Sequence, residues 1–156
     1  YIPKVGARIM SLQEPTNKMS KSDDNENASI YILDPPEVIR RKFKRSVTDS
    51  VGKVQLSDDQ PGIKNLLTIY SVLSGIGLEE AAAKFADSGY GDLKSEVAEV
   101  VVETLQPVQE KFKELMADKP YLEKVYGEGA NKAERTARKT LRRMYKKVGF
   151  VPRSFA

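Results

Sequence analysis

The sequence contains neither cysteine nor histidine, and these two absences exclude several classes of chemistry. Without cysteine the protein can form no disulfide bond and no thiolate metal site. Without histidine it has no imidazole to bind zinc or to act as a general acid or base. Any catalysis must therefore depend on Lys, Arg, Asp, Glu, Ser, Thr and Tyr side chains or on the backbone.

Long apolar runs are also missing. No run approaches the ~20 residues of a membrane-spanning helix, so we expect no membrane association, and no leader of charged and then apolar residues indicates a secretory signal. The 156 residues are about the length of one domain, and 40% hydrophobic and 31% charged residues are typical of a soluble globular protein. The sequence begins at Tyr1 and not at methionine, which indicates a fragment of a longer chain.

Charge is distributed unevenly along the chain. Residues 79–118 contain ten acidic residues against four basic ones, whereas residues 127–156 contain nine basic residues against two acidic ones. The basic C-terminal end favours an anionic partner. The acidic residues lie mostly opposite the apolar stripe of a predicted helix, so we interpret them as a solvated face and predict no metal site.

A polar segment near the N-terminus carries two closely spaced lysines. Residues 18–22, here the KMSKS loop, are followed by two aspartates and lie within a run of turn-forming residues. Lysine binds phosphate as a point charge, and serine hydroxyls and backbone N–H groups add neutral donors. We interpret the segment as a mobile loop that binds a polyphosphate through Lys18 and Lys21. From the residues alone, a solvated run of charge is the alternative.

The rest of the sequence predicts a mainly helical protein. Apolar residues at 5–12 predict one short strand before the KMSKS loop, while residues 28–33 fit either a strand or a first helical turn. Asp34, followed by two prolines, predicts a helix start with Asp34 as the N-cap, and Gly149 predicts a helix end. A break is predicted at residues 127–129. Six helices are predicted, over residues 37–47, 63–74, 78–86, 92–118, 120–126 and 130–148.

The KMSKS sequence, preceded by an apolar strand, resembles the signature loop of the class I aminoacyl-tRNA synthetases. The longer run GARIMSLQEPTNKMSKSDDNENA and the later run PGIKNLLTIYSVLSG resemble the bacterial tryptophanyl-tRNA synthetases. The resemblance covers nearly all of this chain, whereas the chain would cover about the last half of such an enzyme. The second phosphate-binding signature of the family, of the HIGH type, is absent from a sequence without histidine.

The resemblance implies a tryptophan–tRNA ligase that uses ATP, with Mg²⁺, to activate tryptophan and transfer it to tRNA(Trp). The family enzymes are cytoplasmic homodimers. Lys18 and Lys21 would be catalytic, because they would stabilise the leaving pyrophosphate. The ATP-binding residues would be Ile9, Lys18, Met19, Ser20, Lys21 and Ser22. The backbone around Ile9 would meet the adenine ring. The alternative for Ile9 is burial in a core, and both can hold at once. Met19 would anchor the loop against the protein.

The implied fold is mainly α: a helical bundle of the anticodon-binding type, with one short strand and the KMSKS loop left from a Rossmann-like nucleotide-binding domain. The resemblance favours helix at residues 28–33. Residues 1–26 would be the catalytic remnant and residues 27–118 the tRNA-binding part. Residues 119–156 would form C-terminal helices that pack back on the catalytic domain.

Two of the predicted helices concentrate positive charge. Residues 37–47 include Arg40, Arg41, Lys42, Lys44 and Arg45, and residues 130–148 carry eight basic residues. Either face would contact RNA phosphates or would only be solvated. The candidate contacts to the tRNA backbone are Arg40, Arg41, Lys44, Arg138 and Arg142.

Because the amino-acid pocket and the second signature are missing, we expect the fragment to be inactive alone. Two alternatives remain for its function. The first is a helical tRNA-binding module without a catalytic role, and the second is the equivalent half of a tyrosine-specific enzyme.

Overall fold

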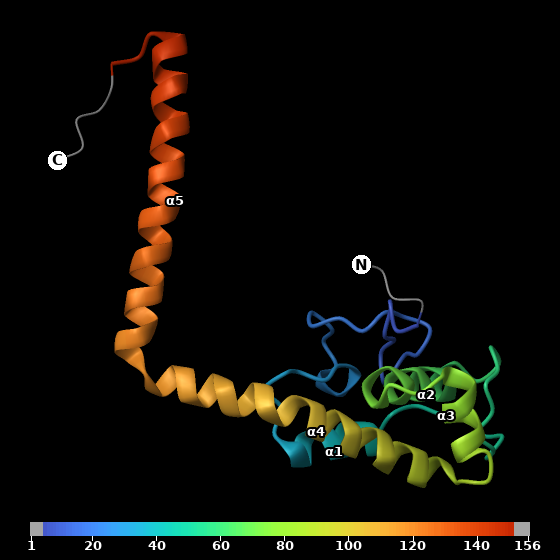
Figure 1. Cartoon of the computed structure of the whole chain (residues 1–156). Coiled ribbons are helices and arrows are strands. Elements are labelled where there is room, and N and C mark those ends of the chain that lie inside the picture. The colour runs from blue at the N-terminus through green and yellow to red at the C-terminus, as the bar shows by residue number, and fades with distance from the viewer. Residues whose placement is uncertain (1–4, 152–156) are drawn as a thin grey trace. The chain divides into compact units, whose positions relative to one another are not determined.

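The computed structural model describes residues 5–151. In this part of the chain a 3-10 turn, η1 (Glu26–Ala28), precedes five α-helices (Figure 1). The helices are α1 (Pro36–Lys44), α2 (Pro61–Ser74), α3 (Leu78–Phe85), α4 (Tyr90–Ala117) and α5 (Lys119–Val148). The prediction of a mainly helical fold is confirmed. The chain divides into two compact units, residues 1–110 and residues 111–156.

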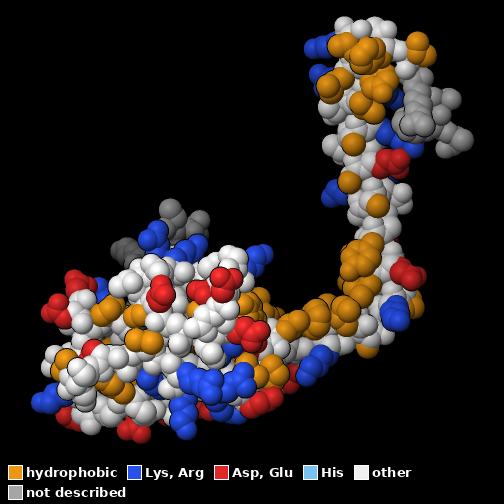
Figure 2. All heavy atoms as spheres, turned by 180° about the vertical axis from the view of Figure 1, so that it is seen from behind, with side chains coloured by type: hydrophobic (Ala, Val, Ile, Leu, Met, Phe, Trp, Pro, Cys, Tyr) orange, Lys and Arg blue, Asp and Glu red, His pale blue; other side chains and the backbone are white. Residues whose placement is uncertain are grey.

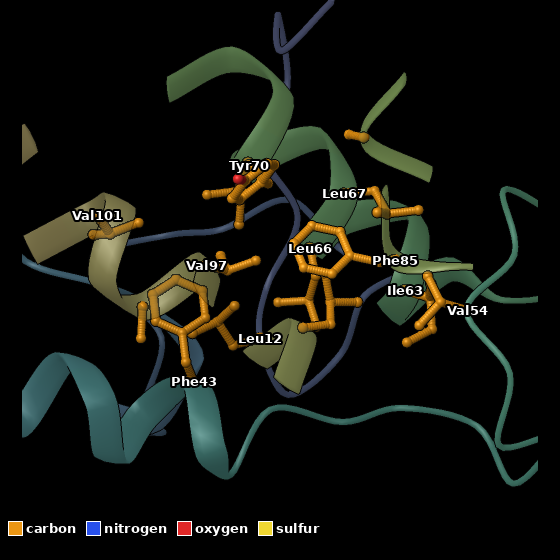
Figure 3. Close-up of a cluster of buried hydrophobic side chains, with 14 of the residues drawn as sticks. Leu12, Phe43, Val54, Ile63, Leu66, Leu67, Tyr70, Phe85, Val97 and Val101 are labelled. Atoms are coloured by element: carbon orange, nitrogen blue, oxygen red, sulfur yellow. The ribbon is translucent and has the colours of Figure 1, made fainter. Parts of the chain in front are cut away.

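The core of the first unit is formed by α1, α2, α3, the first half of α4 and the N-terminal segment. Figure 3 shows Phe43 of α1, Leu66 of α2 and Val97 of α4 in this cluster, and each of them is at most 1% exposed. The ring of Phe85 meets Tyr70 edge-on, with the centroids 5.0 Å apart. Burial of each such side chain contributes about 1.5–3 kcal/mol, so the packing of these helices supports the segment that precedes them.

Local signals set several helix ends. Prolines begin α1 and α2, where the missing N–H group would have no partner in any case. Gly75 ends α2 with φ of 75°, and Gly149 ends α5 with φ of 73°, a region that favours glycine. The predicted helix end at Gly149 is therefore confirmed. Within residues 5–151, no single helix is long and apolar enough to cross a membrane, although the bent pair α2–α3 passes that test by length and composition alone.

The strand predicted at residues 5–12 is wrong. These residues form no strand in the structure, and Met10 makes only an isolated antiparallel bridge with Lys18. A strand requires a neighbour along its whole length. Among the described residues, this segment has one bridge, to Lys18, and its other backbone bonds go to scattered partners such as Ala28 and Val47.

Neither alternative for residues 28–33 is found, so the helix favoured there is wrong as well. η1 ends at Ala28, and Ser29 has extended backbone angles. The predicted N-cap at Asp34 is also wrong, because Pro35 occupies that position. The Asp34 carboxylate instead accepts hydrogen bonds from the Tyr31 N–H group and from the buried Lys42 ammonium. An ammonium removed from water requires such a partner, and this requirement outweighs helix capping.

In the second unit, the two helices predicted at residues 120–126 and 130–148 form the single helix α5. The break predicted between them is wrong, because Gly127 and Gly129 adopt helical geometry and each costs only about 1 kcal/mol there. The helix has no buried residue. Figure 2 shows hydrophobic side chains exposed along α5. Leu141 and Met144 are among the exposed hydrophobic residues of this helix.

A polar network around Asp49 holds the connection between α1 and α2. The Tyr90 hydroxyl donates to the Asp49 carboxylate at 2.5 Å, and the Gln60 amide donates to both groups at 3.1 Å. Burial alone would raise the pKa of Asp49, but hydrogen bonds from Tyr90 and from the Val51 N–H group outweigh it and lower that pKa. The folded state therefore favours the charged carboxylate.

We predict that Asp49→Asn lowers stability most at neutral pH. Because the pKa of Asp49 is lower in the folded than in the unfolded protein, its contribution is fully present above the unfolded value and is lost as the pH falls through the folded value. The difference in unfolding free energy between the wild type and the variant should therefore shrink as the pH falls below the ordinary aspartate pKa of about 4. Urea unfolding at several pH values measures it.

Asp59→Asn is the control for the loss of one negative charge, since Asp59 is an exposed carboxylate in the same connection. A difference between the wild type and Asp49→Asn that stays constant over this pH range would contradict the assigned role of Asp49.

Candidate functional site

The KMSKS loop begins after a turn that brings the chain back beside residues 9–11. The Ser11 N–H group donates to Asn17 O at 2.8 Å, and the Met19 N–H group donates to Ile9 O at 3.0 Å. These two bonds pair the backbone on both sides of the bridge between Met10 and Lys18. The first residues of the loop therefore have a fixed backbone position.

A buried asparagine in α2 forms hydrogen bonds with the backbone of Met10, which precedes this turn. Asn65 Oδ1 accepts a hydrogen bond from the Met10 N–H group at 2.9 Å, and Asn65 Nδ2 donates to Met10 O at 2.8 Å. One side-chain amide thus pairs both backbone groups of Met10, as a neighbouring strand would. Because Met10 also bridges to Lys18, Asn65 links α2 to the first lysine of the loop.

Two apolar side chains attach the loop region to the core. Ile9 and Met19 are partly buried and pack against the hydrophobic cluster of the first unit. The expectation that Met19 anchors the loop is confirmed, and core packing, the alternative given for Ile9, is what the structure shows. Contacts of either residue with ATP stay predictions.

The charged groups of the loop are exposed. Among the described residues, neither the Lys18 nor the Lys21 ammonium forms an ion pair with a carboxylate. The nearby Asp23 carboxylate accepts the Asn25 N–H group at 2.9 Å and pairs with neither lysine. Both positive charges are therefore available to an anion.

The serine hydroxyls of the loop are exposed as well. Ser20 Oγ and Ser22 Oγ lie 2.9 Å apart and share a hydrogen bond, so one hydroxyl donates to the other and the second hydroxyl keeps a free O–H group. Two ammonium groups and two hydroxyls on one short exposed segment are suited to an anion with several oxygens, such as a polyphosphate.

The candidate RNA contacts lie in both units. Arg40, Arg41 and Lys44 are on α1, and Arg138 and Arg142 are on α5. Arg138 forms an ion pair with Glu134 at 2.7 Å within α5. The structure thus places Arg40, Arg41 and Lys44 together on one helix of the first unit, whereas Arg138 and Arg142 belong to the second unit.

A cleft of about 370 Å³ between α1 and α4 is lined by Arg40, Lys44 and Lys94. Arg40 forms a two-pronged ion pair with Glu99, at 2.6 and 2.8 Å. This hydrogen-bonded pair raises the pKa of Arg40 and lowers the pKa of Glu99. Burial lowers the pKa of Lys94, whose ammonium donates to a backbone carbonyl at 2.8 Å.

Sequence reasoning missed Lys94 and misplaced Lys42. Lys94 lies on α4, whose charged residues are mostly acidic in the sequence. Lys94 comes to lie beside α1 only in the folded protein. Lys42 was grouped with the basic residues of α1, but its side chain is buried. A local signal for Lys42 existed, because it lies three residues after the buried Ile39 and next to the buried Phe43, on the apolar side of the helix.

Comparison with known proteins finds relatives over nearly the whole chain. The family model of the class I tRNA synthetases (W and Y) matches residues 2–106. The tryptophan–tRNA ligase of Clostridium perfringens is 52% identical over 153 residues, which are 98% of this chain and 46% of that protein. The tryptophan–tRNA ligase of Bacillus subtilis is 48% identical over 149 residues, which are 95% of this chain and 45% of that protein.

Solved structures show the same likeness. The tryptophanyl-tRNA synthetase of Mycoplasma pneumoniae matches 96% of this chain and 45% of its own, with a TM-score of 0.75 and 34% identity. That of Campylobacter jejuni matches 92% of this chain and 44% of its own, with a TM-score of 0.70 and 24% identity, which shows the fold alone. The chain spans a little under half the length of the relatives that it matches.

We predict that Asn65→Leu releases the turn before the KMSKS loop. The variant keeps a side chain of similar size but leaves the N–H and C=O groups of Met10 without their partner, at a cost of about 1–3 kcal/mol. Hydrogen exchange of the Ser11 and Met19 amides should accelerate more than exchange of the α4 amides.

Asn17→Ala is the matched control, because the Asn17 amide donates only to an exposed carboxylate, that of Glu14. Exchange at Ser11 and Met19 that is equally fast in both variants would show that Asn65 does not fix this turn.

Proposed function

Because the chain belongs to the class I tRNA synthetases for tryptophan and tyrosine, we propose that it supplies the KMSKS loop and the helical tRNA-binding part of a tryptophan–tRNA ligase. Tryptophan is favoured over tyrosine since relatives at 52% and 48% identity are tryptophan–tRNA ligases. The observation that carries the proposal is the pair of exposed lysines, without an ion-pair partner in residues 5–151, on a loop with an anchored backbone.

In the proposed reaction, the carboxylate of tryptophan attacks the α-phosphorus of ATP. A bond forms between the carboxylate oxygen and phosphorus, and the bond to the bridging oxygen breaks, so that pyrophosphate leaves with the electron pair. Negative charge develops on the leaving group. Lys18 and Lys21 would stabilise this charge, because positive charges already in place act where the negative charge develops. Ser20 and Ser22 would donate hydrogen bonds to phosphate oxygens.

ATP is a substrate in this proposal, and Mg²⁺ would accompany its phosphate oxygens. Within residues 5–151 no group of three or more acidic side chains is placed to hold a metal ion. The cations and hydroxyls of the KMSKS loop would contact the phosphate oxygens of ATP. Ile9 and Met19 would complete the nucleotide contacts.

The remaining assignments are proposals drawn from the family. Residues 1–26 would belong to the catalytic domain, residues 27–118 would bind tRNA(Trp), and residues 119–156 would pack back on the catalytic domain. The complete enzyme would be a cytoplasmic homodimer. A piece that lacks histidine, and with it the family's other phosphate-binding signature, would not form the adenylate alone.

We predict that Lys21→Ala slows tryptophan activation by about 10²–10³-fold, the usual cost of losing one preorganised charge-stabilising donor. The assay is tryptophan-dependent ATP–pyrophosphate exchange. The protein is a chimaera in which this chain replaces the corresponding residues of the C. perfringens ligase. Affinity for tRNA(Trp) should stay nearly unchanged.

Lys53→Ala, at an exposed lysine outside the loop, is the control and should keep full activity. The unmodified chain alone should show no exchange. Full exchange activity in both Lys18→Ala and Lys21→Ala would contradict a catalytic loop and would favour the tRNA-binding module instead. A folded but inactive wild-type chimaera would count against the proposed function as a whole.

The cleft between α1 and α4 supports RNA binding, because three cations line it and Glu99 is the only carboxylate there. Lys44 lines the cleft, and Arg41 is exposed on the same helix outside the cleft lining. We predict that the double variant Arg41→Ala/Lys44→Ala weakens binding of a tRNA(Trp) transcript. The slope of log affinity against log salt should fall by about 1.5 for two lost phosphate contacts. Lys111→Ala, which removes a lysine already paired with Glu114, is the control. An unchanged slope would mean that α1 is only a solvated face.

A further inference from the structure

We propose that Lys42 is a positioning residue for the KMSKS loop. Its buried ammonium fixes the segment at residues 29–34, and two hydroxyls of that segment hold backbone carbonyls of the loop. The kinetic consequence rests on the proposed function, whereas the structural consequence does not.

The Lys42 side chain is only 3% exposed and has three partners. Its Nζ atom donates to Ser29 O at 2.8 Å and to Asp34 Oδ2 at 2.7 Å, and it lies 4.5 Å from the centroid of the Tyr31 ring. A buried ammonium without partners is strongly unfavourable. Because all three partners lie in residues 29–34, this segment must keep its position for as long as Lys42 stays buried.

The same segment contacts the KMSKS loop. The Ser29 hydroxyl, which is buried, donates to Ser20 O at 2.7 Å. The Tyr31 hydroxyl donates to Lys21 O at 3.5 Å, at the long limit of a hydrogen bond. Ser29 is therefore the main tie, and Tyr31 is the weaker one. The two carbonyls belong to adjacent residues, one of which is a candidate catalytic lysine.

A second helix holds the segment from its other end. The Gln109 side chain of α4 donates to Ile32 O at 2.8 Å and to Asp34 O at 3.0 Å. Residues 29–34 contain no regular secondary structure, so side chains from α1 and α4 supply the hydrogen bonds that a strand or helix would otherwise provide. Helices α1 and α4 therefore fix the position of the segment, and the segment in turn fixes the position of the loop.

The chemistry of these ties suits a loop that binds an anion. The hydroxyls of Ser29 and Tyr31 bond to carbonyl oxygens of the loop, which would otherwise repel an anion. The ammonium groups of Lys18 and Lys21 take no part in these bonds and stay exposed. A charge that stabilises a leaving group acts only when it is correctly placed, and misplacement by about 1 Å can cost up to 10²-fold in rate. The hydrogen bonds to the carbonyl oxygens of Ser20 and Lys21 limit how far the Lys21 ammonium can move.

Two variants test the proposal, each with a matched control. Ser29→Ala removes one hydroxyl, and its control is Ser71→Ala, because the buried Ser71 hydroxyl also donates to a carbonyl at 2.7 Å but outside the loop. Lys42→Met removes the buried charge. Its control is Lys84→Met, because Lys84 likewise pairs with a carboxylate and lies over an aromatic ring, on α3.

The first measurement is amide hydrogen exchange on this chain. In Ser29→Ala and Lys42→Met, exchange at residues 20–23 should be about tenfold faster, because the loop loses a hydrogen-bonded tie, while the α2 amides keep their protection. The two controls should leave exchange at residues 20–23 unchanged. Unchanged loop exchange in Ser29→Ala would overturn the proposal, even if Lys42→Met fails to fold.

The second measurement is pyrophosphate exchange by the chimaera, well below its unfolding temperature. We expect kcat to fall about tenfold in Ser29→Ala, with KM for ATP changed by less than about twofold, since the lysines remain but are misplaced at the transition state. Ser71→Ala should keep both values. Faster loop exchange with an unchanged kcat would overturn the positioning role. A folded but inactive wild-type chimaera would refute the proposed function, and the exchange result on this chain would stand.

Discussion

Residues 5–34 contain almost no regular secondary structure, and the buried backbone groups of this segment therefore depend on hydrogen bonds from the helices. Asn65 pairs both backbone groups of Met10, and Lys42 and Gln109 pair carbonyls farther along. The Val47 N–H group donates to Leu12 O at 2.8 Å. Each buried group left unpaired would cost about 1–3 kcal/mol, so the helical unit dictates the course of the segment.

This dependence separates the backbone of the KMSKS loop from its charges. The backbone is held at its start by the turn beside Met10 and at its middle by Ser29, whereas Lys18 and Lys21 have no carboxylate partner among the described residues. Arg40 of α1 differs from these two lysines, since it is already paired with Glu99. Unpaired cations on a fixed backbone are the arrangement that electrostatic stabilisation of a leaving group requires.

Local sequence signals predicted the helices well, because apolar periodicity, prolines and Gly149 act within a few residues of one another. The loop and its exposed lysines were recognisable for the same reason. The absence of a strand at residues 5–12 was not predictable, since strand pairing depends on neighbours that are distant in the sequence. The buried state of Lys42 depends on Asp34 and on residues that fold against α1. Helix α5 continues through residues 127–129 because a glycine costs only about 1 kcal/mol within a helix. The sequence prediction of a break there overestimated this cost.

Acetylation of lysines in the chimaera, followed by mass spectrometry, tests most directly the proposal that the KMSKS loop binds ATP. Without nucleotide, Lys18 and Lys21 should react quickly because they are exposed, and Lys42 should react slowly because it is buried. Addition of ATP and tryptophan should slow acetylation of Lys18 and Lys21 but not of Lys53. Equal acetylation of both loop lysines with and without ATP would contradict their role in binding the polyphosphate.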